Sequence, residues 1–250
     1  MSGHSRWSQI KRKKGKADVQ RGKLFSKILR EITVAARNGG ADSKVNMRLK
    51  AAVESAKEAN MPADNVKRAI QKGTGELPGE AYEEITYEGY APGGVAVMIR
   101  VLTDNRNRTA PELRHTFEKY GGNMGASGAV AWMFDRKGII RVDADKISED
   151  DLMTVALDAG ATDMTQVEKA FEITTAPAEM EAVRAALERA RVPVLEAEVT
   201  LVPQSTVRVE GKEAPTVLRL VEALEDLDDV QAVYANYDIP DEIIEAISAG

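Results

Sequence analysis

The stretch GIIRVDADKISEDDLMTVALDAGATDMTQVEKAFEITTAPAEMEAVRAALERARVPVLEAEVTL, residues 138–201, decides the fold class of this chain. Short β-rich runs alternate in it with two segments whose apolar residues recur at helical spacing. The predicted elements are a strand at 138–142, a helix at 148–159, strands at 163–168 and 170–175, a helix at 177–190 and a strand at 194–201. This βαββαβ order is typical of a ferredoxin-like unit, an antiparallel sheet with both helices on one face.

The segments on either side of this stretch predict a second α+β unit. Before it we expect strands at 84–90 and 94–102, a helix at 110–120, a glycine-rich loop and a strand at 130–134, and after it a strand at 205–210, a helix at 214–226 and a strand at 230–236. The late elements have no partners of their own, so they most economically complete the sheet begun at residue 84. We therefore predict a ferredoxin-like domain, 137–202, inserted into a middle domain made of 77–136 and 203–250.

Residues 1–76 predict a basic arm and a helical domain. One helix runs from about Asp18 to Gly39-Gly40, a second begins near Ser43 with Val45 on its apolar stripe, and a short third helix ends at Gly73. The Gly/Pro-rich segment 73–80 is the first domain boundary. The predicted fold class is α+β multidomain, with an N-terminal α-helical bundle followed by two α+β domains, the third ferredoxin-like and inserted in the second.

Charge is distributed unevenly along the chain. Residues 1–72 hold 11 Lys and 7 Arg against 6 acidic residues, a net charge of +12, whereas residues 73–250 hold 16 basic against 34 acidic residues, a net charge of −18. A basic end on an acidic body offers one surface to a polyanion and keeps it off the rest. The alternative is a solvated, charged helical surface, but the length and one-sidedness of the run favour polyanion binding.

The residue types that the chain lacks exclude several function classes. There is no Cys, which rules out disulfides and thiolate chemistry, and the two histidines, His4 and His115, fall in different predicted domains. The acidic clusters at 222–229 and 238–245 lack ligand-loop spacing and are interpreted as solvated faces. We therefore predict a protein that is not an enzyme, with no catalytic residues, no metal site and no cofactor. No apolar run is long enough to span a bilayer and no secretory signal is recognisable, so we expect a soluble, cytoplasmic protein without a membrane partner.

Three motifs leave alternatives open. Trp7 lies among basic residues and either stacks on an unpaired base or pins the arm to the helical domain. The segment 104–109 joins a strand to a helix that Thr109 is expected to cap, so Arg106 and Arg108 either form an anion site or pair with local carboxylates. The glycine-rich loop 121–128 is interpreted as a flexible or sharply turned connection rather than a phosphate cradle, because it runs from helix to strand.

Several of these segments together resemble the YebC/PmpR family. They are GHSRW at 3–7, the Lys/Arg run at 11–16, RGKLFSKILREI at 21–32, ANMP at 59–62, GTGE at 73–76, YEEITYEGYAPGGVA at 82–96, TDNRNRT at 103–109 and GGNMGASGAVAWMF at 121–134. The chain departs from the family pattern at Met47, where Pro is common, and at Arg12, where His is common. The resemblance implies three domains, the third inserted in the second, and a non-enzymatic regulator of gene expression.

We accordingly predict a nucleic-acid-binding regulator that resembles DNA-binding transcriptional regulators. The alternative is a ribosome-associated, RNA-binding translation factor that aids elongation, including through proline-rich stretches. The expected partner is DNA or ribosomal RNA, with the ribosome as a further candidate, and the protein is expected to be a monomer. The residues expected to contact nucleic acid are His4, Arg6, Trp7, Lys11, Arg12, Lys13, Lys14, Lys16, Arg21, Lys23, Lys27, Arg30, Arg106 and Arg108.

Overall fold

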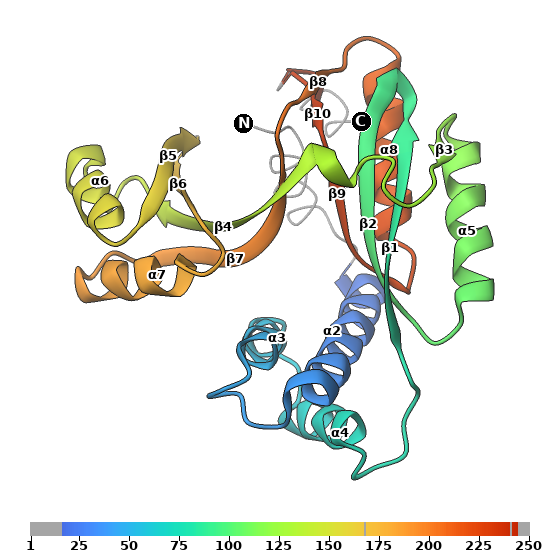
Figure 1. The fold of residues 1–250 in the computed structure, drawn as a ribbon, viewed down its shortest axis with the longest axis horizontal. Helices are drawn as coiled ribbons and strands as arrows, with labels where there is room; N and C mark the ends of the chain where they lie inside the picture. Colours follow the sequence, from blue (N-terminus) through green and yellow to red (C-terminus); the bar gives the residue numbers. More distant parts are fainter. Residues whose placement is uncertain (1–16, 168, 241, 245–250) are drawn as a thin grey trace. The chain divides into compact units, whose positions relative to one another are not determined.

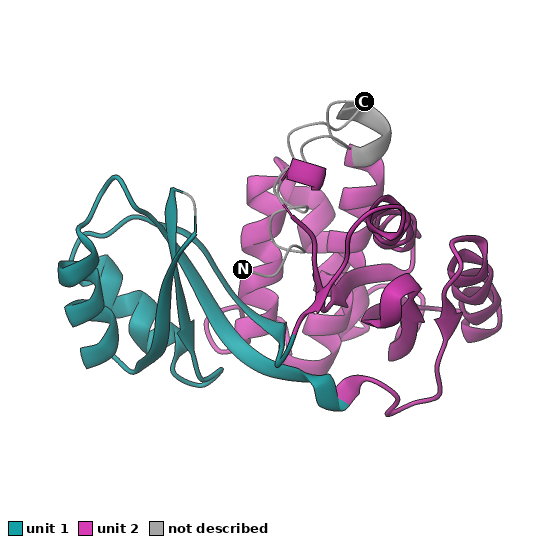
Figure 2. Ribbon diagram, turned by 90° about the horizontal axis from the view of Figure 1, so that it is seen from above, with its two compact units in different colours: residues 1, 132–205 teal, residues 2–131, 206–250 magenta. Residues whose placement is uncertain are grey.

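The computed structural model describes residues 17–167, 169–240 and 242–244. The described chain combines helices with two four-stranded antiparallel sheets and one short parallel strand pair, so the α+β class predicted from the sequence is confirmed (Figure 1). The chain divides into two compact units, residues 132–205 and the remainder (Figure 2).

Three helices form the N-terminal part of the larger unit: α2 (Ala17–Gly39), α3 (Met47–Glu58) and α4 (Ala63–Thr74). Each has a stripe of small or branched apolar side chains, and these stripes meet in one core around Ile32, Leu49 and Ala69. The stripes of α3 and α4 leave the outer surface of these helices to charged and polar residues, whereas α2 is buried on all sides from Ile32 to Ala36.

Helix α3 begins later than the sequence pattern predicted. Its N-cap is Asn46, whose side-chain oxygen accepts from the N–H of Leu49 and whose amide donates to the carbonyls of Ala35 and Gly40. The buried Asn46 amide thus ties the helix start to the end of α2. Val45, expected on the apolar stripe, precedes the helix and is 76% exposed.

Helix α4 ends later than predicted. Its C-cap is Gly75, with φ of 83°, a left-handed conformation that glycine adopts without strain. Gly73, the predicted end, lies inside the helix, where its lack of a side chain allows α4 to pack closely against α2. A Cβ there would lie 2.4 Å from the carbonyl oxygen of Thr33 on α2, so only glycine permits this approach.

The middle part of the larger unit is a sheet with two helices. Strands β1 (Glu83–Ala91), β2 (Val95–Thr103), β3 (Asn123–Met124) and β9 (Val230–Ala235) pair in the order β3-β1-β2-β9. The short 3₁₀ turn η1 (Pro92–Gly94) joins β1 to β2. Strand β9 therefore does complete the sheet that begins near residue 84.

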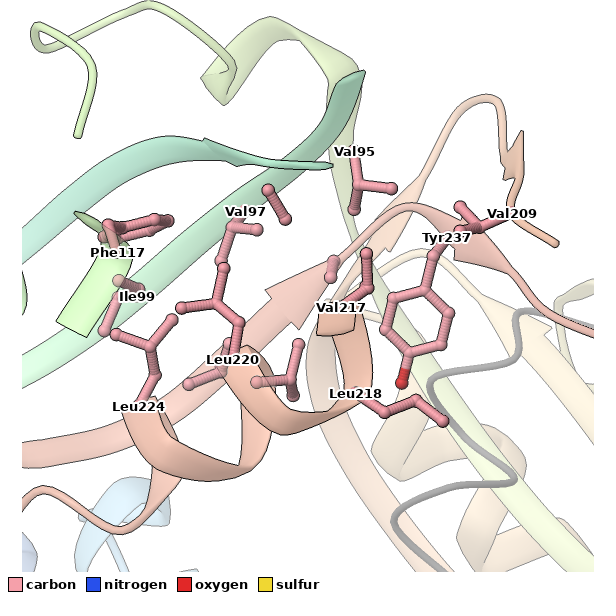
Figure 3. Close-up of a cluster of buried hydrophobic side chains, with 14 of the residues drawn as sticks. Val95, Val97, Ile99, Phe117, Val209, Val217, Leu218, Leu220, Leu224 and Tyr237 are labelled. Atoms are coloured by element: carbon pink, nitrogen blue, oxygen red, sulfur yellow. The ribbon is translucent and has the colours of Figure 1, made fainter. Parts of the chain in front are cut away.

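Helices α5 (Arg106–Lys119) and α8 (Glu213–Glu225) contribute to one core with this sheet. Val97 and Ile99 of β2 pack with Leu220 and Leu224 of α8 and with Phe117 of α5 (Figure 3). Alternate residues of β2 face the helices, as the period of a strand requires.

Two of the expected strands differ in the structure. The predicted strand 205–210 shrinks to β8 (Val207–Arg208), which pairs in parallel with β10 (Tyr237–Asp238) outside the main sheet. The predicted strand 130–134 is mostly the 3₁₀ turn η2 (Ala131–Met133), since the N–H groups of Val130 and Ala131 donate to a carboxylate and leave no ladder.

The smaller unit contains six elements: β4 (Phe134–Asp143), α6 (Glu149–Asp158), β5 (Ala161–Val167), β6 (Ala170–Thr175), α7 (Met180–Arg189) and β7 (Val194–Pro203). Its strands pair in the order β5-β6-β4-β7, and all neighbours are antiparallel. Its core joins Ile140 and Ile173 of the sheet to Leu152 of α6 and Leu187 of α7. Among the residues that the structure describes, no helix is long and apolar enough to cross a membrane.

Candidate nucleic-acid interface

The predicted contact residues of the arm, His4, Arg6, Trp7, Lys11, Arg12, Lys13, Lys14 and Lys16, lie outside the described residues. The predicted residues of the first helix are described. Arg21 is exposed on α2 and stacks on the ring of its neighbour Phe25, with 5.4 Å between the guanidinium carbon and the ring centre.

Three other predicted residues of α2 are engaged within the protein. They donate to main-chain carbonyls at the C-terminal end of α8: Lys23 to Asp226 over 3.0 Å, Lys27 to Glu225, and Arg30 to Asp228. The last carbonyls of a helix lack intrahelical partners and carry the negative end of its dipole. Lys23 and Lys27 therefore cap α8, and Arg30 binds the turn that follows it. In this conformation all three cations are turned toward the protein rather than toward a polyanion.

Asp229, just beyond the end of α8, is the centre of a buried polar network. Its side chain is 4% exposed. Its Oδ2 atom accepts from the hydroxyls of Thr103 and Thr109 and from the guanidinium of Arg108, at 3.0, 2.6 and 2.7 Å. Its Oδ1 atom lies 3.4 Å from the guanidinium of Arg30. Burial opposes ionisation of this carboxyl, but the hydrogen bonds and the charge of Arg108 outweigh it and hold the pKa of Asp229 below its usual range.

The burial of Asp229 corrects the interpretation of the acidic cluster 222–229 as a solvated face. At this position the carboxylate organises the junction of β2, α5 and α8. Within the described ranges, no group of three or more His, Asp or Glu side chains is arranged to hold a metal ion.

The second predicted anion site lies at the start of α5. The N-cap is Asn105, whose side chain accepts from the N–H of Arg108, so the expectation that Thr109 caps this helix is wrong. The hydroxyl of Thr109 is directed to Asp229 instead.

The two arginines near that cap differ in their surroundings. Arg108 pairs with the carboxylates of Asp104 and Asp229. For this residue the structure therefore matches the second of the two predictions, pairing with carboxylates of the protein. Arg106 is largely exposed, with Glu83 4.0 Å away. Anion binding at this helix start stays a prediction, and Arg106 is the better placed of the two for it.

The glycine-rich loop surrounds an anion that the protein itself supplies. The buried carboxylate of Glu88 on β1 accepts from the N–H groups of Gly128, Val130 and Ala131, at 2.7, 2.7 and 2.8 Å. Burial raises the pKa of a carboxyl, but these three donors outweigh that effect and lower the pKa of Glu88. Those N–H groups are therefore occupied, and of the two connections that the sequence left open, flexible or sharply turned, the structure shows the sharply turned one.

A four-residue ionic network links α2, α3 and the sheet. Arg48 of α3 donates to Glu31 over 2.7 Å and forms a bidentate pair with Glu84 of β1, with two hydrogen bonds of 2.8 and 2.9 Å. Arg100 of β2 contacts the same two carboxylates at 3.0 and 3.3 Å. This network removes two more cations from the outer surface.

The sequence analysis missed one group of basic residues that the structure leaves exposed. Lys67, Arg68 and Lys72 lie on α4, and all three are exposed. The available signal was their spacing, because positions 67, 68 and 72 fall on the side of the helix opposite the apolar stripe.

Comparison with known proteins places this set of residues in a family. A sequence model described as the TACO1/YebC protein N-terminal domain matches residues 5–76, and one described as the TACO1/YebC second and third domain matches residues 82–237. The chain belongs to the TACO1/YebC family.

Relatives in the TACO1/YebC family match over their whole length. A probable transcriptional regulatory protein of Pelotomaculum thermopropionicum is 59% identical over 96% of this chain and 100% of the relative. A protein of the same description from Desulforapulum autotrophicum is 55% identical, with coverage of 99% and 100%. The crystal structure of a conserved hypothetical protein from Aquifex aeolicus has a TM-score of 0.81 and 53% identity, and the match covers 91% of this chain and 94% of that one.

Proposed function

We propose that this protein is a regulator of transcription that binds DNA through its N-terminal arm and helical domain. The observation that carries the proposal is the charge distribution, a net of +12 in residues 1–72 against −18 in the rest. Neutralising phosphates with Lys and Arg supplies most of the sequence-independent affinity for DNA. The acidic remainder repels the polyanion and restricts it to one end of the chain.

The family supports the same function. TACO1/YebC relatives more than 50% identical to this chain carry the description of probable transcriptional regulatory proteins. We infer a non-enzymatic role for this chain, acting in the cytoplasm on nucleic acid. His115, the one described histidine, is exposed on α5.

We further propose a three-domain arrangement, 1–76, 77–136 with 203–250, and 137–202. The strand order β5-β6-β4-β7 with alternating helices is that of a ferredoxin-like unit, and this supports its assignment as an inserted domain. The compact unit at residues 132–205 has nearly the proposed limits.

Fluorescence anisotropy of the full chain with a labelled duplex DNA tests the function. Affinity should fall steeply with salt, by roughly one log unit per log unit of salt for each phosphate neutralised. The arm variant Lys13→Gln/Lys14→Gln should bind more weakly than the control Lys146→Gln/Lys212→Gln, which removes the same charge from exposed positions of the acidic body. Equal affinities of the two variants would contradict a role for the arm.

A second experiment separates transcription from translation. Cross-linking of the protein in cells, followed by sequencing of the bound nucleic acid, should recover promoter DNA. Recovery of ribosomal RNA, together with co-sedimentation with ribosomes after DNase treatment, would overturn the proposed transcriptional role in favour of the ribosome.

A further inference from the structure

The helical domain presents its basic residues in two different ways. Five of those on α2 and α3 are already bonded to the protein: Lys23, Lys27, Arg30 and Arg48 as described above, and Arg37, which donates to the carbonyl of Tyr82. A phosphate would have to displace these partners. The surface that can receive a polyanion without rearrangement must therefore be sought elsewhere on the domain.

The packing of α4 on α2 determines which side of α4 faces outward. Gly73 lies so close to α2 that a Cβ would overlap the Thr33 carbonyl oxygen, and the hydroxyl of Thr33 donates to the carbonyl of Ala69 over 3.3 Å. Ala69 is itself buried. At 100° per residue, positions 67, 68, 71 and 72 occupy a sector of about 140° on the opposite side of the helix.

Three of these four positions are basic. Lys67, Arg68 and Lys72 are exposed, and none of them forms a hydrogen bond or an ion pair within the described chain. The carboxylates of α4 and its C-terminal turn lie at either end of the face. Asp64 is in the first turn, and Glu76 is bonded to Gln71 and Thr74 at 3.4 and 3.3 Å. No acidic residue separates Arg68 from Lys72.

Helix α3 provides the contrast. Its outer side carries the half-buried Lys50 and the exposed Lys57, but Glu54 lies four residues after Lys50 and three before Lys57, and Glu58 follows Lys57 directly. Charges at these spacings are neighbours on a helix and attract each other, so the α3 face is close to self-neutralised. On α4 only Asp64 stands at these spacings, from Lys67 and Arg68, so that face keeps three cations against one carboxylate of the helix.

We propose that the outward face of α4, formed by Lys67, Arg68 and Lys72, contacts the phosphate backbone of duplex DNA as a second site beside the arm. This inference rests on the proposed DNA-binding function. About 24 Å of helix separates Ala17, the first residue of α2, from Thr33, against which α4 packs. That span corresponds to roughly seven base pairs of duplex along its axis. The contact reads no sequence and positions the domain on the duplex.

The experiment compares two double variants of the full chain in salt titrations against a labelled duplex. Arg68→Gln/Lys72→Gln removes two charges from the α4 face, and Lys50→Gln/Lys57→Gln removes two charges, one half-buried and one exposed, from the α3 face. The slope of log K against log salt should fall by about 1.8 for the α4 variant, the value for two lost phosphate contacts. The α3 variant should keep a slope close to that of the wild type. Equal changes in the two variants would overturn the proposal.

A site-specific measurement guards against effects on folding. A photo-crosslinking residue at Gln71, on the α4 face, should form an adduct with the duplex, and the same residue at Glu54 of α3 should not. Adducts from position 54 alone would overturn the proposal. If the wild-type chain itself shows no salt-dependent binding to the duplex, the proposed function fails instead. Stronger binding of a structured RNA with the same loss in the α4 variant would retain the phosphate contact and overturn DNA as its partner.

Discussion

The guanidinium of Arg108 lies 2.7 Å from Oδ2 of Asp229, a residue 121 positions further along the chain. The pair joins the first turn of α5 to the segment that follows α8. The same carboxylate receives Arg30 from the helical domain, so one buried charge connects three parts of the larger unit. The contact explains why this acidic residue is buried although its neighbour Asp228 is exposed.

Replacing Asp229 should therefore cost far more stability than replacing its neighbour. Asp229→Asn keeps the shape but removes the charge, and it places an amide donor among the donors of Thr103, Thr109 and Arg108. We expect a loss of about 2–3 kcal/mol in the free energy of unfolding, because these buried donors lose a charged acceptor and the new amide N–H groups find no acceptor among them. Asp228→Asn makes the same chemical change at an exposed position and should cost less than about 0.5 kcal/mol. Urea unfolding of both variants measures this, and similar losses would show that the network does not stabilise the fold.

Glu88 should control the order of the glycine-rich loop. A Gln at this position presents one acceptor and one donor group to three N–H groups, so at least one of them loses its partner. Glu88→Gln should lower the free energy of unfolding by about 2 kcal/mol, within the range for hydrogen bonds to charged groups. Amide hydrogen exchange should accelerate at Gly128, Val130 and Ala131. Unchanged protection there would contradict the role of the carboxylate, and Glu118→Gln, an exposed change on α5, is the control.

The two buried carboxylates also set a direction for the pH dependence of stability. The pKa values of Asp229 and Glu88 are lowered by folding, so both groups bind protons more weakly in the folded than in the unfolded state. Their stabilisation is fully present above the unfolded-state pKa values, which are about 4, and it is lost as the pH falls through the lower folded-state values. Acid titration of the wild type should show a steeper loss of stability below about pH 4 than the double variant Asp229→Asn/Glu88→Gln. Parallel curves would contradict this assignment.

The order of the elements could be predicted from the sequence because hydrophobic periodicity is a local property. The helix ends were predicted less well where a side chain decided them. Asn46 caps α3 because its amide also bonds to Ala35, eleven residues earlier, and no local pattern shows that second contact. At α5 the cap is Asn105 because tertiary structure directs the hydroxyl of Thr109 to Asp229.

The candidate interface was predictable in its charge but not in its detail. A count of Lys and Arg identifies the basic end, whereas only the fold shows which cations are bonded internally. Lys23 and Arg30 find their carbonyl partners about 200 positions away. The sequence gives no sign of that pairing, and the exposed group on α4 was overlooked because it is shorter than the run in the arm.

Met47 provides a test of where α3 begins. It is the first residue of the helix, and its N–H is among those that an α-helix leaves without an intrahelical partner. A proline disfavours the helical conformation in the residue before it. Asn46 has φ of −95° and ψ of 89°, which is not helical, so it can precede a proline without strain. Met47→Pro should therefore raise the free energy of unfolding by about 0.4–1 kcal/mol, because proline restricts the unfolded chain without breaking a hydrogen bond.

The matched control for Met47→Pro is Val45→Pro, two residues earlier. Val45 is more exposed than Met47, but its N–H donates to the carbonyl of Asp42 over 3.2 Å, and proline would remove that bond. Val45→Pro should therefore destabilise the protein. A third variant, Met47→Ala, measures the effect of losing the Met side chain without adding the proline ring. Thermal melts of the three variants decide the matter. If Met47→Pro destabilises the chain at least as much as Val45→Pro, the N–H of residue 47 is bonded and α3 begins nearer to Ser43, as the hydrophobic pattern alone predicted.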